Sequence, residues 1–233
     1  MRLHRFYIEQ PLGEELVVVE KELVHQWISV FRYKSGDEVI LFSSLGRGVD
    51  YIYSISSASK TEVALSFVSK QDNILPKKNI TLCMAVVKKD TFENTVRHAT
   101  ELGVSKIIPI LASRSEKKNL NMERLSSIVL ESAEQSGRGD LPIISEIIPF
   151  KEAFNVLSST SIFMSLNGET AHSFVRKLLP DENMTVWIGP EGGWTDDEEA
   201  YAKENGAKLM KLTETVLRAD TAATCALSTI VLV

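Results

Sequence analysis

The sequence predicts an α/β protein in two parts, a small β-barrel over residues 1–72 and a parallel sheet with helices on both faces over residues 73–233. Two observations lead to this prediction. Up to about residue 70, short β-rich runs alternate with turn residues, which is typical of a compact β structure. From Ile80 onward, β-prone runs alternate with helical patterns, and repeated strand–helix units form parallel sheets. The polar, proline-bearing stretch 71–79 has neither period and is the best linker candidate.

In the first part, five β-rich runs predict strands, and Gly46 and Gly48 supply a hairpin loop within residues 43–48. One segment breaks the pattern, because Leu23, Trp27 and Phe31 recur at helical spacing. The expected strands are 3–8, 16–19, 38–43, 49–56 and 62–68, with one helix over 22–31.

In the second part, caps and glycines define the helix ends. Asp90 is placed to cap a helix that closes at Gly103, and Thr195 with Glu198 three residues on forms a capping box. The expected strands are 80–87, 106–111, 143–148, 161–166, 184–188 and 208–212. The expected helices are 90–102, 121–135, 151–157, 171–179, 196–205 and the uncharged tail 221–233, which is either a core helix or a subunit interface.

The stretch 185–194 is the centre of the second part. A β-prone run stops at Gly189 and Pro190, turns through Gly192 and Gly193, and enters a capped helix. Glycine allows a positive φ and close approach of the backbone, which leaves main-chain N–H groups able to bind a ligand. An ordinary strand-to-helix turn is the alternative. A phosphate-binding P-loop is disfavoured, because the stretch lacks the lysine and hydroxyl residue of that motif.

Ligands of parallel sheets bind beyond the carboxyl ends of the strands. Three predicted loops lie at such ends, namely 166–169, 189–193 and 213–221. They are therefore expected to form one site.

Charge is unevenly distributed along the chain. Residues 1–118 hold 17 Lys+Arg and 14 Asp+Glu, a net +3, whereas residues 119–233 hold 9 and 17, a net −8, which together give the overall −5. The first half is the more suitable surface for nucleic acid, although its basic groups could equally be solvated faces.

The sequence contains no apolar run of 18 residues and no apolar signal-peptide core near its first residues, so a soluble cytoplasmic protein without membrane partners is expected. Cys83 and Cys225 each sit among apolar residues and are expected to be buried. The four histidines lack second ligands at metal spacing, so no metal site is expected.

Several short motifs keep the order and spacing of one known family. They are His4-Arg5-Phe6, Glu101-Leu102-Gly103-Val104, Glu134-Gln135-Ser136 with Arg138, Ile188 to Gly193, and Leu217-Arg218 with Thr221-Ala222. On these motifs the chain resembles the ribosomal small-subunit methyltransferase E family, of the SPOUT class of S-adenosylmethionine-dependent RNA methyltransferases. The likeness covers nearly the whole chain.

The resemblance implies a PUA-like β-barrel that helps to bind RNA, followed by a SPOUT domain whose last helix is threaded into a deep trefoil knot. It implies that S-adenosyl-L-methionine is bound by the three loops, and that the active unit is a homodimer with its interface near the uncharged helix. The implied cofactor-binding residues are Leu166, Asn167, Ile188, Gly189, Pro190, Glu191, Gly192, Gly193, Leu212, Thr213, Val216, Leu217, Arg218 and Thr221.

The implied reaction is methylation of N3 of one uridine in 16S ribosomal RNA of the small subunit. The imide nitrogen is a poor nucleophile, so positioning and a base must share the work. Arg218 is expected to orient the uracil carbonyls or stabilise the developing anion, with a capping or interface salt bridge as the alternative. Asp220 or Glu191 is the candidate base, with a helix cap or an arginine pair as the alternative.

The target uridine is expected to be unstacked from ribosomal RNA, free or in the assembled subunit. Arginines are expected to bind its phosphates, with surface ion pairs as the alternative. These are Arg2, Arg5, Arg32, Arg114 and Arg138.

Three positions depart from the family pattern, namely Thr213, Ala219 and Asp220. Thr213 stands where the family has glycine and would be strained if the loop required a positive φ. A non-catalytic RNA-binding or ribosome-assembly protein on the same scaffold is therefore the alternative function.

Overall fold

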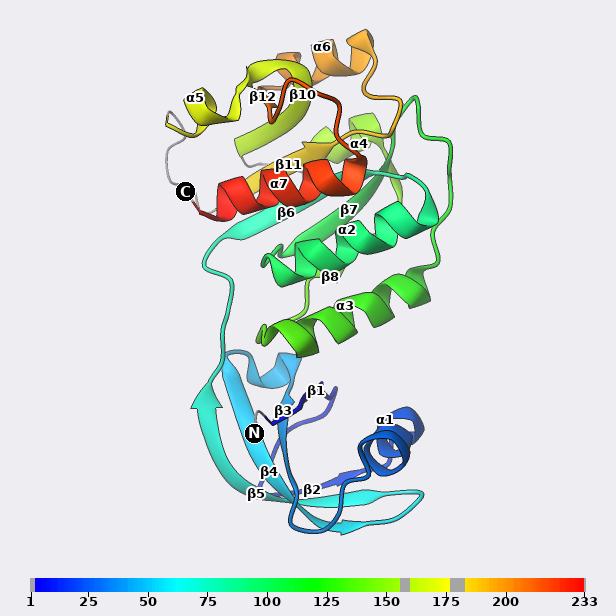
Figure 1. Cartoon of the computed structure of the whole chain (residues 1–233), viewed down its shortest axis with the longest axis vertical. Coiled ribbons are helices and arrows are strands. Elements are labelled where there is room, and N and C mark those ends of the chain that lie inside the picture. Colours follow the sequence, from blue (N-terminus) through cyan, green and yellow to red (C-terminus); the bar gives the residue numbers. More distant parts are fainter. Residues whose placement is uncertain (1–2, 156–159, 177–182, 233) are drawn as a thin grey trace. The chain divides into compact units, whose positions relative to one another are not determined.

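The structure is a computed structural model that describes residues 3–155, 160–176 and 183–232. The chain forms two compact units (Figure 1). The first contains residues up to Leu75 together with Ala133–Asp140, and the second contains Pro76–Ser132 and residues from Leu141 onward. The segment Ala133–Asp140 returns to the first unit after the chain has entered the second.

The first unit is a curled sheet in the order β1-β3-β4-β5-β2 (Figure 1). Its strands are β1 (Arg5–Tyr7), β2 (Glu15–Val18), β3 (Glu38–Phe42), β4 (Val49–Ala58) and β5 (Val63–Asp72). All neighbours are antiparallel except β1 and β3, which run parallel. β5 continues to Asp72, so the predicted linker begins too early, because Gln71 and Asp72 still pair with β4.

The predicted helix of this unit is confirmed, although only its first part is α-helical. α1 (Lys21–His25) continues directly into a π-helical segment, Gln26–Phe31, which ends at Arg32 in the left-handed conformation. Trp27, in the π-helical segment, is fully buried and packs edge-on against Phe6 of β1, with ring centroids 5.1 Å apart. The segment therefore closes the core of the curled sheet.

The second unit is an α/β sheet in the order β12-β10-β11-β6-β7-β8, with β9 pairing β7, and its pairings are all parallel. Its strands are β6 (Asn79–Ala85), β7 (Lys106–Leu111), β8 (Ile143–Ile144), β9 (Ile148–Pro149), β10 (Thr160–Thr170), β11 (Asn183–Ile188) and β12 (Lys208–Lys211). Its helices are α2 (Lys89–Glu101), α3 (Met122–Ser136), α4 (Phe150–Asn155), α5 (Ala171–Val175), α6 (Asp196–Glu204) and α7 (Ala219–Val231). The last residues of α3, from Ala133 onward, belong to the first unit.

Helices cover both faces of this sheet, as predicted. Side chains from α2, α3, α5 and α7 form one core with alternate residues of the strands, and side chains from α4 and α6 form a second core on the opposite face. α2 and α7 lie side by side (Figure 1), and His98 Nδ1 lies 3.0 Å from the Thr224 hydroxyl across this contact. β11 is buried along most of its length between the two cores.

Several predicted boundaries are corrected. The expected strand 143–148 is two short pieces, and the N-cap of α2 is Lys88, with Asp90 inside the first turn. The expected strand 161–166 continues to Thr170, because the chain returns to β12 after an excursion. The ends of the helices expected at 151–157 and 171–179 lie outside the described residues.

Candidate functional site

A pocket of about 420 Å³ lies at the carboxyl ends of β10, β11 and β12 in the second unit. The three loops that sequence analysis expected to converge all line it. Arg114, Glu199 and the start of α7 complete the wall. The strands are neighbours in the sheet, so residues far apart in sequence meet at one edge.

The glycine loop after β11 forms one wall of the pocket. Gly189 packs against the buried Trp194, whose indole nitrogen would be 3.0 Å from a Cβ at this position. Gly193 has φ 70° and donates its N–H to the Pro190 carbonyl at 2.9 Å. The Arg114 Nη1 donates to the carbonyls of Gly192 at 2.8 Å and Trp194 at 3.1 Å, so this arginine fixes the loop from outside.

The excursion of β10 forms a second wall. Met164 and Glu169 both pair with Met210, so residues 165–168 loop out of the sheet between them. Glu199, in the first turn of α6, accepts hydrogen bonds from the Asn167 side-chain amide at 3.0 Å and from the Ser165 hydroxyl. Glu199 was not among the predicted site residues. It lies beside the capping box in sequence, and no local pattern points it at a strand 32 residues away.

The loop after β12 forms the third wall without strain at Thr213. Among the described residues other than glycine, only Arg32 has a positive φ. The Thr213 hydroxyl donates to the Thr215 carbonyl at 2.6 Å, a turn that suits threonine. Thr213 therefore does not adopt the left-handed conformation, and threonine in place of glycine causes no backbone strain at this position.

The structure brings twelve of the fourteen predicted cofactor residues to the pocket. They are Leu166, Asn167, Ile188, Gly189, Pro190, Glu191, Gly192, Gly193, Leu212, Thr213, Val216 and Leu217. Arg218 and Thr221 do not line it. Arg218 is the exposed N-cap residue of α7, between two lining residues, and Thr221 lies exposed in the first turn of that helix.

The two candidate bases differ in position. Glu191 lines the pocket, is exposed, and accepts a hydrogen bond from the Lys88 main-chain N–H at 3.3 Å. Asp220 does not line the pocket, and its carboxylate accepts the N–H of Thr221 at 2.9 Å. This hydrogen bond supports the alternative role of Asp220, which is to cap the N-terminus of a helix.

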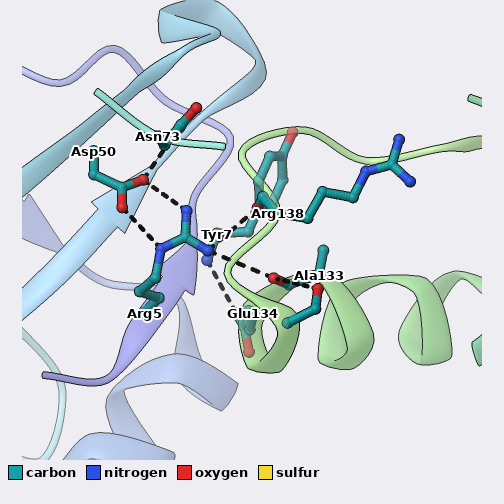
Figure 2. A network of polar contacts seen from close by, with 8 residues as sticks. Arg5, Tyr7, Asp50, Asn73, Ala133, Glu134 and Arg138 are labelled. Atoms are coloured by element: carbon teal, nitrogen blue, oxygen red, sulfur yellow. Dashed lines mark hydrogen bonds and ion pairs between the residues drawn. The ribbon is translucent and has the colours of Figure 1, made fainter. Parts of the chain in front are cut away.

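Arg5 is a correction to the expected phosphate-binding set. Its side chain is 6% exposed, and its guanidinium donates to both oxygens of Asp50, at 2.6 and 2.9 Å. Figure 2 shows the third nitrogen directed at the carbonyls of Ala133 and Arg138, at 3.5 and 3.2 Å. Each guanidinium nitrogen makes a hydrogen bond inside the first unit and the residue is buried, so the position of Arg5 does not suit a phosphate contact.

Arg138 is a second correction, since it is 5% exposed and its Nε donates to Asp140 at 2.6 Å. Burial lowers the pKa of the Arg138 guanidinium, against the opposing effect of Asp140. Arg32 and Arg114 are exposed, and the prediction that they bind phosphate stays a prediction. Arg2 lies outside the described residues.

The cysteines lie in different environments. Cys83 is buried in β6, and burial raises the pKa of its thiol. Cys225 is exposed on α7, which corrects the expectation that it is buried.

In the described part of the chain, no three His, Cys, Asp or Glu residues gather in a way that could hold a metal ion. Within that same part, no helix combines the length and apolar character that a membrane span needs.

Comparison with known proteins identifies the family. A family model described as an RNA methyltransferase domain matches residues 74–231. A ribosomal RNA small subunit methyltransferase E from Synechocystis is 31% identical, over 95% of this chain and 74% of its own length. The chain belongs to the ribosomal RNA small subunit methyltransferase E family. The resemblance drawn from its motifs is confirmed.

Other members of this methyltransferase E family match the chain over nearly its full length. The ribosomal RNA small subunit methyltransferase E from Rickettsia conorii is 29% identical, over 98% of this chain and 95% of its own length. The methyltransferase E structure from Neisseria gonorrhoeae, bound to S-adenosyl methionine, is 28% identical with a TM-score of 0.86, and covers 97% of this chain and 96% of that one. The expected fold is confirmed, and the trefoil knot stays a prediction.

Proposed function

We propose that this protein is a cytoplasmic enzyme that uses S-adenosyl-L-methionine to methylate N3 of one uridine in 16S ribosomal RNA. The observation that carries the proposal is the pocket, where three chain segments meet at the carboxyl ends of β10, β11 and β12. The relative from Neisseria gonorrhoeae, which has the same fold, binds S-adenosyl methionine. Family membership supports small-subunit ribosomal RNA as the substrate.

The residues present fit this cofactor. Ile188, Leu212 and Leu217 give the pocket apolar walls suited to a planar base, and its volume of about 420 Å³ lies within the range of small-molecule sites. Gly189 and Gly192 expose main-chain groups, and Glu199 offers a carboxylate to hydroxyl groups. When bound, the cofactor would supply an electrophilic methyl group.

The chain's own residues would position the uracil and accept its proton. Glu191 is the proposed base, because its carboxylate is exposed at the pocket wall. Arg218 is proposed to direct its guanidinium to the uracil carbonyls and stabilise the negative charge that develops on them. Leu217 and Ala219 on either side of it both line the pocket, so its main chain lies at the rim.

We further propose that residues 1–72 act as an RNA-binding PUA-like barrel and that residues 73–233 form a methyltransferase domain with a knotted cofactor site. Arg32 and Arg114 are the remaining arginines proposed to contact phosphate. A homodimer is proposed through the exposed face of α7, which carries Thr221 and Cys225. The alternative of a non-catalytic scaffold loses one of its three reasons, since Thr213 is not strained.

Two measurements test the function. Calorimetry should show that the purified protein binds S-adenosylmethionine. Mass mapping of 16S ribosomal RNA from a strain lacking the protein should show one uridine unmethylated, restored by the wild type and not by Arg218→Ala. Absence of cofactor binding at millimolar concentration would favour the non-catalytic scaffold. Full methylation restored by Arg218→Ala would remove Arg218 from the reaction.

A further inference from the structure

A second cavity of about 340 Å³ lies in the second unit, at the carboxyl ends of β6 and β7. The turn that follows β6, the start of α2, the segment after β7 and the start of α3 enclose it. Its lining residues are Val87, Lys89, Phe92, Glu93, Lys117, Asn119, Leu120, Asn121 and Leu125. None of these residues has a role in the function proposed above.

This cavity adjoins the cofactor pocket. β6 pairs in parallel with β11, with Met84 opposite Ile188, so both strands end at the same edge of the sheet. The Lys88 N–H donates to the Glu191 carboxylate at 3.3 Å. Glu191 lines the first pocket and Lys89 lines the second. This hydrogen bond therefore connects Glu191 in the wall of the first pocket to the residue that precedes Lys89 in the wall of the second.

The cavity has an apolar floor and a basic rim. Val87, Phe92 and Leu125 are buried and form the floor. Two lysines, two asparagines and one acid form the rim. The acid, Glu93, lies 3.7 Å from both Lys89 and Arg124, so Arg124 shares with Lys89 the balancing of its charge. Lys117 forms no ion pair with any described residue.

These groups fit an anion that carries a flat, polar-edged ring. Lysine ammonium groups bind phosphate as point charges. α2, which begins at Lys89, has no side-chain cap, so its N-terminal end adds a positive field that Asp90 in the first turn partly offsets. The Asn119 amide offers a donor and an acceptor, Asn121 offers its amide donor because its Oδ1 already accepts the Arg124 N–H at 3.0 Å, and Phe92 lies in the floor. An RNA nucleotide has each of the complementary groups.

We propose that this cavity binds one nucleotide of the substrate RNA, with its phosphate at Lys89 and Lys117 and its base over the floor at Asn119. The proposal rests on the function proposed above, because it names where that enzyme holds its RNA. It places RNA at Lys89, next in the chain to Lys88, whose N–H donates to Glu191, the residue proposed to accept the proton.

The first test measures RNA affinity. A single-stranded RNA oligonucleotide containing uridine is titrated with the full-length protein at several salt concentrations. Lys89→Ala with Lys117→Ala should weaken binding about tenfold and lower the slope of log K against log salt by about 0.7, the value for one phosphate of a single strand. Lys118→Ala is the matched control, because Lys118 is the exposed neighbour of Lys117 outside the cavity and should bind as wild type.

The second test separates phosphate recognition from a general loss of positive charge. Wild type should bind uridine 5′-monophosphate about tenfold more tightly than uridine. The double variant should bind both equally. If the double variant kept the same preference for the monophosphate as the wild type, the proposal would be overturned. The proposal would also be overturned if the double variant bound RNA as tightly as Lys118→Ala.

These binding measurements need neither cofactor nor turnover, so they are independent of the methylation test. Loss of RNA affinity in the double variant together with no methylation by wild type would leave the nucleotide site standing and refute the proposed reaction. Methylation by wild type with unchanged RNA affinity in the double variant would refute the nucleotide site alone. Cofactor affinity should be the same in all three proteins.

Discussion

Gly168 lies where two stretches of backbone approach more closely than a side chain allows. A Cβ at this position would lie 2.6 Å from both the amide nitrogen and the carbonyl carbon of Met210. This contact lets the excursion of β10 fold back onto β12, and so it sets the position of Asn167 in the pocket wall. The φ of Gly168 is not positive, so the requirement is one of space rather than of backbone conformation.

Gly168→Ala is therefore expected to destabilise the protein by about 1–3 kcal/mol, the usual cost of overpacking. It should also weaken S-adenosylmethionine binding at least fivefold, because Asn167 moves. Gly206→Ala is the matched control, since Gly206 has φ 82° and open space around it. That variant should cost about 1 kcal/mol and leave cofactor affinity unchanged. Urea unfolding and calorimetry measure the two quantities, and equal cofactor affinity in both variants would contradict the assignment.

Tyr33 predicts a pH dependence in the first unit. Burial first, and the Asp37 carboxylate second, raise its pKa from 10.0 to about 12. The unfolded chain releases this proton near pH 10 while the folded chain holds it, so between pH 10 and 12 the unfolded state binds fewer protons. Stability should be unaffected by this group below pH 10 and should fall as pH rises through that window.

Urea unfolding of wild type and Tyr33→Phe at several pH values checks this expectation. The difference in free energy of unfolding between the two proteins should be constant below pH 10 and should change in favour of Tyr33→Phe between pH 10 and 12. Taking the difference removes the contribution of Tyr53, whose pKa burial also raises. A difference that stays constant across the whole range would show that Tyr33 titrates normally.

At the scale of elements, the Arg5–Asp50 ion pair attaches the segment Ala133–Asp140 to β1 within the first unit. Arg5 joins β1 to Asp50 of β4 and to the carbonyls of Ala133 and Arg138 in that segment, and the Tyr7 N–H donates to Glu134 (Figure 2). Removing one partner of a buried pair leaves an uncompensated charge. Arg5→Ala is therefore expected to cost about 3–5 kcal/mol.

Arg47→Ala provides the matched control for this pair. Arg47 bonds Asp140 of the same segment at 3.0 Å, but its side chain is 64% exposed. An exposed pair contributes about 0–1 kcal/mol. The two variants are compared by urea unfolding, and equal losses would mean that the buried pair contributes no more than the surface one.

Whether an element could be predicted from sequence depended on the distance between the residues that determine it. The Thr195–Glu198 capping box was predicted correctly, because both partners lie within one turn of helix. Arg5 was wrongly assigned to phosphate, since an arginine near a chain end resembles a surface residue and its partner is 45 residues away. Only the fold shows that the pair is buried.

The pocket was largely predictable for a topological reason. A parallel sheet brings the carboxyl ends of its strands to one edge, so loops after consecutive strands could be assigned to one site. The side chains that reach in from other elements were not predictable. Glu199 comes from α6 and Arg114 from the loop after β7, and no periodic pattern encodes those directions. The second cavity was missed for the same reason.

At the scale of the whole molecule, the proposed subunit contact depends on α7, which carries no charge beyond Asp220 in its first turn. One side of α7 is in the core through Ala223, Leu227 and Ile230. The other side is exposed and carries Cys225, and Val231 and Leu232 are exposed at its end. Sequence could not separate the two sides, because both are made of small or apolar residues and the helix has no charged face.

The proposed homodimer predicts that Cys225 is protected by self-association. Alkylation of its thiol should be fast in dilute protein and should slow as concentration rises, whereas buried Cys83 should react only in urea. Cys225→Arg should place an unpaired charge in the contact and yield a monomer by light scattering. Glu204→Arg, an exposed substitution on α6, should leave the dimer intact. An alkylation rate for Cys225 that is independent of concentration, together with an unchanged mass for Cys225→Arg, would place the subunit contact elsewhere.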